Sequence, residues 1–133
     1  MTAEGTGRYL AIKVMMMPRD TNPQGTIFGG VLLSYIDQAG AAGARFEMAR
    51  AGWRESSIVT VAVNGVEFLQ PVFVGDLVSF WTELERIGRT SITMRVTVEM
   101  DRRGETIRLT EAQVTYVAIE TEGDHRVPIP VRG

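Results

Sequence analysis

Residues 22–49 read NPQGTIFGGVLLSYIDQAGAAGARFEMA, and a change of pattern within this stretch decides the fold. Residues 18–26 contain two prolines, a glycine, an asparagine and an aspartate, a composition typical of a loop with tight turns. From Gly29 to about Ala49 the apolar residues recur at intervals of three and four. This spacing predicts a long helix with one broad apolar face.

Two glycines, Gly40 and Gly43, lie in the middle of the predicted helix. A glycine inside a helix costs about 1 kcal/mol relative to alanine, so two of them close together require a compensating reason. Close approach of side chains from a sheet to the helix backbone supplies one. We therefore expect a buried helix with a sheet wrapped around it.

The remaining sequence alternates between apolar and polar residues, as extended strands do. Strands are expected at residues 9–17, 58–69, 77–87, 91–100 and 106–119. The short turns at Gly88–Arg89 and at residues 101–104 make the adjoining strands antiparallel. One long helix on an antiparallel sheet of about five strands is an α+β arrangement. The pattern thus predicts a single domain over residues 1–133, with a core at about 9–119 and a C-terminal tail at 120–133.

The composition excludes several classes of function. The 133 residues include no cysteine and one histidine, which excludes a thiol nucleophile, a cysteine-ligated metal centre and a multi-histidine metal site. A formal net charge of −2 provides no basic surface for nucleic acid or for an acidic membrane. The longest apolar stretch, residues 27–36, is about half the length of a membrane span, so we expect no membrane association and a cytoplasmic location. Carboxylate, hydroxyl, amide and backbone chemistry remain.

Two features at the start of the predicted helix suit chemistry. Gly29 and Gly30 open the helix, and their free amides at its positive end allow a ligand oxygen to approach the backbone closely. Such amides can stabilise an oxyanion during attack on a carbonyl. Asp37 follows on nearly the same side of the helix, among apolar neighbours where an unpaired carboxylate is costly. On spacing alone, the glycines can equally serve a turn, and the aspartate can equally be a solvated or structural residue.

Four linked motifs give the chain a family resemblance. They are N-x-x-G-x-x-F-G-G at residues 22–30, S-Y-I-D ending at Asp37, V-T-V-A-V at 59–63 and F-L-Q-P-V-x-V-G-D at 68–76. Together they resemble the hotdog-fold acyl-CoA thioesterases, in particular the bacterial YciA-like hydrolases and the related cytosolic acyl-CoA thioester hydrolases. The resemblance implies a hotdog fold, with one long central helix wrapped by an antiparallel sheet. It also implies hydrolysis of an acyl-CoA thioester to a free carboxylic acid and coenzyme A.

The same resemblance implies roles for individual catalytic residues. The helix aspartate of the family, matched here by Asp37, acts as general base on water or as direct nucleophile. The amide of the helix-opening glycine, matched by Gly29 or Gly30, polarises the thioester carbonyl. Asn22 matches an asparagine that in some relatives assists the carbonyl or the water. Thr60 matches a position where some relatives use a hydroxyl to orient the water.

Further residues are expected to contact the substrate. The turn from Gly88 to Ser91 offers amides, hydroxyls and a guanidinium for the phosphates of coenzyme A, and the equivalent turn of relatives lies near the nucleotide. The expected substrate-binding residues are Thr26, Phe28, Gly88, Arg89, Thr90, Ser91 and Arg126. Purely solvated roles for Arg89 and Arg126 stay open. No metal and no separate cofactor are expected, because coenzyme A is part of the substrate.

The distance along the helix bears on assembly. Gly29 and Asp37 are separated by about 12 Å at ~1.5 Å per residue. Attack on a carbonyl requires the nucleophile and the oxyanion donor within about 3 Å of one reacting centre. We therefore expect a composite site, with Asp37 from one subunit and the Gly29–Gly30 amides from its partner. The resemblance implies the same homodimer, often assembled further into a trimer of dimers.

Two alternatives to hydrolysis exist for a chain of this pattern. The hydroxyacyl dehydratases are a similar family with the same fold, and they carry a histidine in the loop before the helix. This chain has Phe28 at that place. The single imidazole, His125, lies near the C-terminus in a charged segment, so dehydration is not expected. A non-catalytic acyl-CoA binding or regulatory module stays open. Thr26, which stands where near relatives often carry an aspartate or asparagine, favours that module, and Asp37 opposes it.

Overall fold

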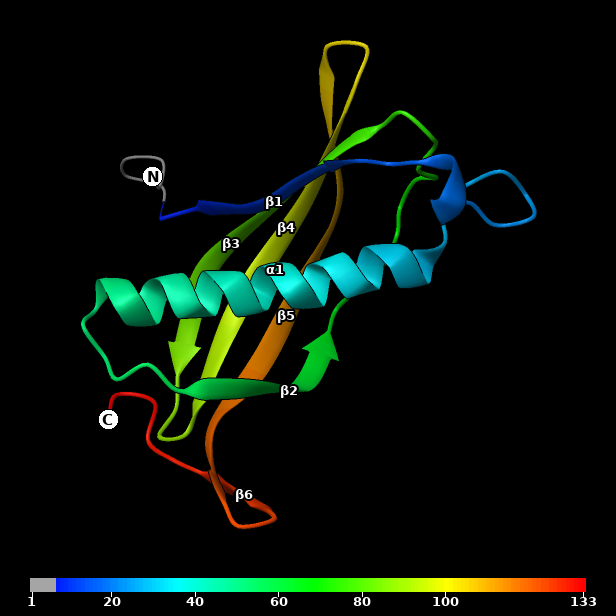
Figure 1. Cartoon of the computed structure of the whole chain (residues 1–133). Helices are drawn as coiled ribbons and strands as arrows, with labels where there is room; N and C mark the ends of the chain where they lie inside the picture. Colours follow the sequence, from blue (N-terminus) through cyan, green and yellow to red (C-terminus); the bar gives the residue numbers. More distant parts are fainter. Residues whose placement is uncertain (1–6) are drawn as a thin grey trace.

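The computed structural model describes residues 7–133, which form one long helix, one short 3-10 helix and six strands (Figure 1). The helices are η1 (Pro18–Asp20) and α1 (Gly29–Arg50). The strands are β1 (Tyr9–Met15), β2 (Ser57–Asn64), β3 (Leu77–Ile87), β4 (Ser91–Arg102), β5 (Glu105–Glu122) and β6 (His125–Pro128). The long helix therefore occupies the segment that its apolar spacing predicts.

The described strands form one antiparallel sheet in the order β1-β3-β4-β5-β2, and β6 pairs with the end of β5. Helix α1 crosses one face of this sheet and packs mainly on β3 and β4 (Figure 1). Strands β1 and β2 form the two edges of the main sheet. The predicted α+β architecture, one helix against an antiparallel sheet, is confirmed.

The core lies between α1 and the sheet. On β4 every second side chain is fully buried toward the helix, namely Ile92, Met94, Val96, Val98 and Met100. From the helix side, Leu32, Ile36 and Ala39 enter the same core. This alternation is the one that a strand with a single buried face requires.

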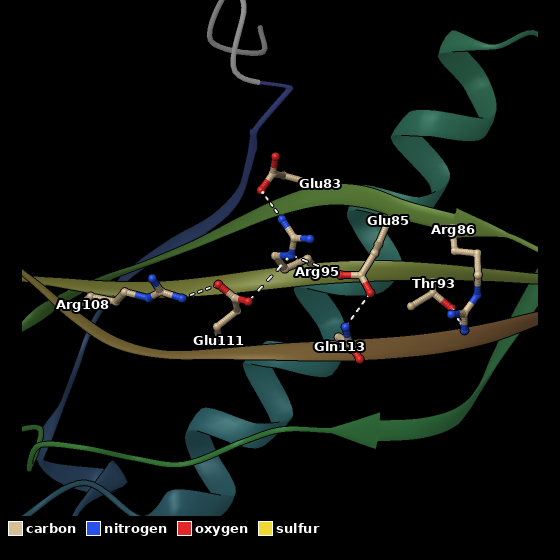
Figure 2. Close-up of polar contacts among 8 residues, drawn as sticks. All are labelled: Glu83, Glu85, Arg86, Thr93, Arg95, Arg108, Glu111 and Gln113. Atoms are coloured by element: carbon tan, nitrogen blue, oxygen red, sulfur yellow. Dashed lines mark hydrogen bonds and ion pairs between the residues drawn. The ribbon is translucent and has the colours of Figure 1, made fainter.

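The opposite face of the sheet is charged, and its side chains pair with one another (Figure 2). On β4, Nε of Arg95 lies 3.1 Å from Oε1 of Glu85 on β3 and 3.7 Å from Oε2 of Glu111 on β5. Its Nη1 lies 3.5 Å from Oε1 of Glu83, also on β3. These partly exposed ion pairs contribute little stability each. The charged side chains do, however, mark this face of the sheet as the polar one, opposite the apolar face that packs on α1.

The two helix glycines are explained by close packing. A Cβ atom at Gly40 would lie 2.2 Å from the hydroxyl oxygen of Tyr116, and one at Gly43 would lie 2.2 Å from Oγ1 of Thr82. Since real Cβ atoms do not approach other atoms this closely, both positions require glycine. The expectation that sheet side chains approach the helix backbone is confirmed.

The predicted strand at residues 58–69 is wrong at its end. Strand β2 stops at Asn64, because Gly65 has a positive φ of 78° and leaves the extended conformation. Residues 65–76 instead form a loop that reaches the start of α1. There the ring of Phe68 lies 3.4 Å from the Cβ position of Gly29. The apolar run that resembles a strand therefore packs over the helix start.

Other boundaries also differ from the prediction. The strand expected at residues 9–17 ends at Met15. The turn expected at residues 101–104 is shorter, because Arg103 and Gly104 have φ values of 53° and 80° and connect β4 to β5 as a two-residue turn. The strand expected at 106–119 extends over Glu105–Glu122. The segment expected as a tail contributes β6 to the sheet.

An ion pair ties the loop at residues 65–76 to β4. Nη2 of Arg102 donates to Oδ2 of Asp76 at 2.6 Å, and its Nε donates to Oδ1 at 3.0 Å. The hydrogen bonds from Arg102 hold the pKa of Asp76 below its ordinary value. The loop in turn meets the segment before α1, where the Ile27 amide donates to the Val72 carbonyl at 2.8 Å. The helix start is thereby anchored to the sheet.

Candidate active site

The candidate site centres on Asp37, in the middle of α1. Its side chain is partly buried, and Oγ1 of Thr60 on β2 donates a hydrogen bond to its Oδ1 at 2.6 Å. Helix and edge strand thus bring together two residues that lie 23 positions apart in the sequence. A carboxylate at the margin of an apolar core is less costly when one of its oxygens accepts a hydrogen bond.

A second contact reaches the main chain of the same aspartate. The hydroxyl of Tyr116 on β5 donates to the Asp37 carbonyl oxygen at 2.6 Å. Burial raises the pKa of Tyr116 far above its ordinary value, and the nearby negative charge of Asp37 raises it further. The phenol therefore stays protonated and remains a donor. The sequence did not single out Tyr116, because a tyrosine in an alternating strand does not reveal what its hydroxyl meets.

The start of α1 presents unused backbone donors. The amides of Val31 and Leu32 donate to the Phe28 carbonyl at 3.1 and 3.4 Å, whereas those of Gly29 and Gly30 donate to no residue in the described part of the chain. A Cβ at Gly30 would meet nothing within 4 Å, so this backbone is open to approach. Free amides at the positive end of a helix favour a partly negative oxygen.

An open groove joins these features. It has a volume of about 670 Å³ and runs from Gly30 past Leu33 to Asp37, with Val63 and Val66 on its other wall. A smaller cavity of about 260 Å³ lies beside Gly29 and is lined mainly by apolar side chains of residues 26–32 and 68–72. Apolar walls with a carboxylate and free amides suit a substrate with an apolar chain and one reactive carbonyl.

Asn22 and Thr26 shape the loop that leads into α1. The Asn22 Oδ1 accepts hydrogen bonds from the amides of Gln24 and Thr26, both at 3.0 Å, and its Nδ2 donates to the Thr26 hydroxyl at 2.8 Å. Both side chains are thus engaged with their own loop. The side chain of Phe28, which follows, is 48% exposed.

The remaining expected substrate contacts lie elsewhere in the chain. The turn between β3 and β4 lies beside β5 and the C-terminal residues, away from the start of α1 (Figure 1). There the Arg89 carbonyl accepts from the Val131 amide at 3.0 Å, and the Thr90 carbonyl accepts from the Ala118 amide at 2.9 Å. The side chains of Arg89 and of Arg126, on β6, are exposed. One chain by itself does not bring these groups to Gly29 and Gly30.

Metal clusters and membrane-spanning helices are both absent from residues 7–133. No group of three or more histidine, cysteine, aspartate or glutamate side chains in this range is arranged to hold a metal ion. Neither described helix combines the length and the apolar character of a membrane span. His125 lies exposed at the start of β6.

Comparison with known proteins gives consistent results. The family model of the thioesterase superfamily matches residues 24–107. The chain is 39% identical over 129 residues to the acyl-CoA thioester hydrolase YciA of Salmonella typhimurium, covering 93% of this chain and 92% of that protein.

Solved structures of thioesterases are also similar to this chain. A hexameric thioesterase from Yersinia pestis superposes with a TM-score of 0.78 and 37% identity, covering 96% of this chain and 99% of that chain. A hexameric hotdog fold thioesterase of Campylobacter jejuni superposes with a TM-score of 0.72 and 38% identity, covering 90% and 89% of the two chains. The architecture described above is therefore shared over nearly the whole chain.

Proposed function

The chain belongs to the thioesterase superfamily and has the hotdog fold, and we propose that it hydrolyses acyl-CoA thioesters to a free carboxylic acid and coenzyme A. Acyl-CoA as the substrate class is supported by the name of the Salmonella typhimurium relative. The single observation that carries the proposal is the groove that contains both Asp37 and the open backbone of Gly30. The groove exposes a base and an oxyanion donor on one surface, and each acts with the complementary group of a partner subunit.

Asp37 is the catalytic carboxylate in this proposal. Thr60 occupies its Oδ1, which leaves Oδ2 to take a proton from water or to attack the thioester itself. In the first route the water oxygen bonds to the carbonyl carbon while its proton passes to Asp37. In the second route an anhydride forms and water then hydrolyses it. The carbon–sulfur bond breaks in both routes, and coenzyme A leaves as its thiolate.

The amides of Gly29 and Gly30 stabilise the oxyanion. Hydrogen-bond donors that are already oriented toward the developing negative charge lower the barrier without reorganising during the reaction. The open space at Gly30 allows the thioester oxygen to approach. Asn22 and Thr26 support this arrangement by holding the loop before the helix, and Phe28 lies beside the substrate.

The site is composite across a homodimer. Edge strand β2 carries Val61 and Val63, which are 56% and 40% exposed, and Leu33 on α1 is 40% exposed beside the same groove. An open strand edge with apolar side chains favours pairing with another chain. In the dimer Asp37 of one subunit acts with the glycine amides of its partner, and three dimers form the hexamer.

Coenzyme A is bound by groups that one chain holds far from its own helix start. The turn Gly88–Ser91 and the exposed Arg126 supply amides, hydroxyls and guanidinium groups for the phosphates. Assembly brings these groups to the site of a neighbouring subunit. The reaction uses no separate cofactor and no metal, and the protein acts in the cytoplasm.

The test is thiol release from a panel of acyl-CoAs, from acetyl to palmitoyl, by the purified oligomer. We expect turnover with at least some chain lengths. Binding of coenzyme A without thiol release from any member of the panel would contradict the proposal. That result would instead support a non-catalytic acyl-CoA binding module.

A further inference from the structure

We propose that Tyr116 is a positioning residue for Asp37, and that the Thr60–Tyr116 pair on neighbouring strands holds this aspartate at two points. Thr60 holds the carboxylate through Oδ1 at 2.6 Å, and Tyr116 holds the backbone carbonyl at 2.6 Å. The inference rests on the proposed catalytic role of Asp37. Tyr116 itself is 1% exposed and acts only through the aspartate.

The two donors form a single unit of the sheet. Thr60 on β2 lies directly opposite Tyr116 on β5 in the antiparallel register. Directly opposite residues project from the same face of the sheet, here the face that meets α1. A hydrogen bond to the side chain and another to the main chain of one residue restrain both its position and its rotation.

The register of β2 changes directly after this pair. The pairing with β5 shifts between Thr60 and Ala62, so that Val61 is an extra residue in β2. Such a bulge bends the strand and redirects the side chains next to it. The bulge therefore lies directly beside Thr60, the residue of β2 whose hydroxyl points toward the helix.

Gly40 makes the second contact possible. Its missing Cβ would lie 2.2 Å from the Tyr116 hydroxyl oxygen, and 3.2 and 3.3 Å from Cζ and Cε2 of the same ring. The space above this glycine lets the hydroxyl reach the Asp37 carbonyl, three residues earlier on the helix. The contact between Tyr116 and Asp37 therefore requires glycine at position 40.

The chemistry of the contact suits positioning. Burial keeps the phenol protonated by raising the pKa of Tyr116, so its hydroxyl donates throughout the working pH range. Displacing a reacting group by about 1 Å can lower the rate by roughly a hundredfold. Because Tyr116 is buried and does not line the groove, loss of its hydroxyl affects kcat rather than KM.

The first test is Tyr116→Phe, which removes only the hydroxyl. We expect kcat to fall by about tenfold to a hundredfold with KM nearly unchanged. Tyr9→Phe is the matched control, because the Tyr9 ring stacks on Phe46 with centroids 4.1 Å apart and takes no part in the site. We expect the control to keep both kinetic constants. A wild-type kcat in Tyr116→Phe would overturn the proposal.

A second variant separates positioning from packing. In the double variant Gly40→Ala with Tyr116→Phe, the added methyl group occupies the space that the hydroxyl vacates. We expect a melting temperature above that of Gly40→Ala alone, because the closest overlap is removed, together with a kcat that stays low. Recovery of wild-type kcat in this double variant would show that the hydroxyl acts by packing alone, and would overturn the proposal.

A crystal structure of Tyr116→Phe tests the contact independently of turnover. We expect the Asp37 carboxylate to move away from Thr60, and an unchanged distance between them would overturn the proposal. If the wild-type protein hydrolyses no acyl-CoA, the proposed function fails. The crystal structure still decides whether Tyr116 positions Asp37.

Discussion

Asp37 is restrained at two of its three oxygen atoms by side chains from two different strands. Thr60 donates to the carboxylate and Tyr116 to the carbonyl, both at 2.6 Å. In a partly apolar groove, these contacts keep one carboxylate oxygen satisfied and leave the other available. The reactivity that we propose for this aspartate therefore depends on its neighbours as well as on its own chemistry.

The Thr60 contact predicts a specific kinetic effect. Thr60→Val keeps the shape of the side chain and removes the donor. Since a hydrogen bond to a charged group is worth about 1.5–3 kcal/mol, we expect kcat to fall by roughly tenfold to a hundredfold. Thr97→Val, on the charged face of β4, is the control and should retain wild-type kcat. If steady-state kinetics gave the same kcat for Thr60→Val and Thr97→Val, the role of Thr60 in holding Asp37 would be contradicted.

The Asp76–Arg102 pair predicts a pH effect on stability. Because Arg102 holds the pKa of Asp76 below its ordinary value, the ion pair contributes its full stability above the unfolded-state pKa and loses it as the pH falls through the folded-state pKa. Asp76→Asn should lower the melting temperature at neutral pH by several degrees. The difference from wild type should shrink between about pH 5 and pH 3.

Thermal unfolding measured across this pH range checks the prediction. Asp124→Asn, in the exposed turn before β6, is the control and should follow the wild type throughout. A melting-temperature difference for Asp76→Asn that stays constant down to pH 3 would show that Asp76 is not the group whose protonation matters.

At the level of the elements, local patterns predicted most of the fold. The apolar period locates α1, and alternation locates β3 over the observed Leu77–Ile87. The exceptions depend on contacts between distant segments. Strand β2 ends before Gly65, where the chain turns, and the apolar residues after it pack on the helix start instead of extending the strand. Strand β6 forms because β5 extends far enough to pair with it. Neither contact has a signature in the local sequence.

The helix glycines give a prediction about stability. In an unconstrained helix, replacing glycine with alanine stabilises by about 1 kcal/mol. At Gly43 the new methyl group would lie 2.2 Å from Oγ1 and 2.7 Å from Cβ of Thr82. We expect Gly43→Ala to destabilise the fold by about 1–3 kcal/mol, as overpacking does.

Chemical denaturation measures this change. Adding Thr82→Ala removes Oγ1 and should recover part of the lost stability, because the remaining overlap is with Cβ alone. A Gly43→Ala protein more stable than the wild type would show that the helix is not pressed against β3.

At the scale of the whole molecule, the sequence predicts more site residues than one chain brings together. Asp37 and Thr60 lie in contact, and Gly30 lines the same groove as Asp37. The turn between β3 and β4, and strand β6, which carries Arg126, lie apart from the helix start (Figure 1). No local pattern predicts whether a neighbouring subunit brings such groups together. Tyr116 was missed for a related reason, since its role depends on the register of two strands that are distant in sequence.

Mixing two inactive variants tests the composite site. Asp37→Asn removes the carboxylate, and Gly30→Pro removes one amide at a helix position that tolerates proline. In a mixed dimer one of the two sites receives an intact Asp37 from one subunit and intact amides from the other. Unfolding and refolding the two variants together should restore about a quarter of wild-type activity, because half of the dimers are mixed.

Each variant refolded alone is the control for the mixing experiment and should stay inactive. A mixture that also stays inactive, although mass spectrometry shows mixed dimers, would place Asp37 and its oxyanion donors in one chain.

The measurement that tests the central claim most directly is the kcat of Asp37→Asn on the best acyl-CoA substrate, beside that of Asp124→Asn. We predict that Asp37→Asn loses at least about a thousandfold in kcat, as expected for a catalytic base or nucleophile, and still binds coenzyme A in calorimetry. The control should match the wild type. Undiminished turnover by Asp37→Asn would contradict the account, because another group would then have to attack the thioester.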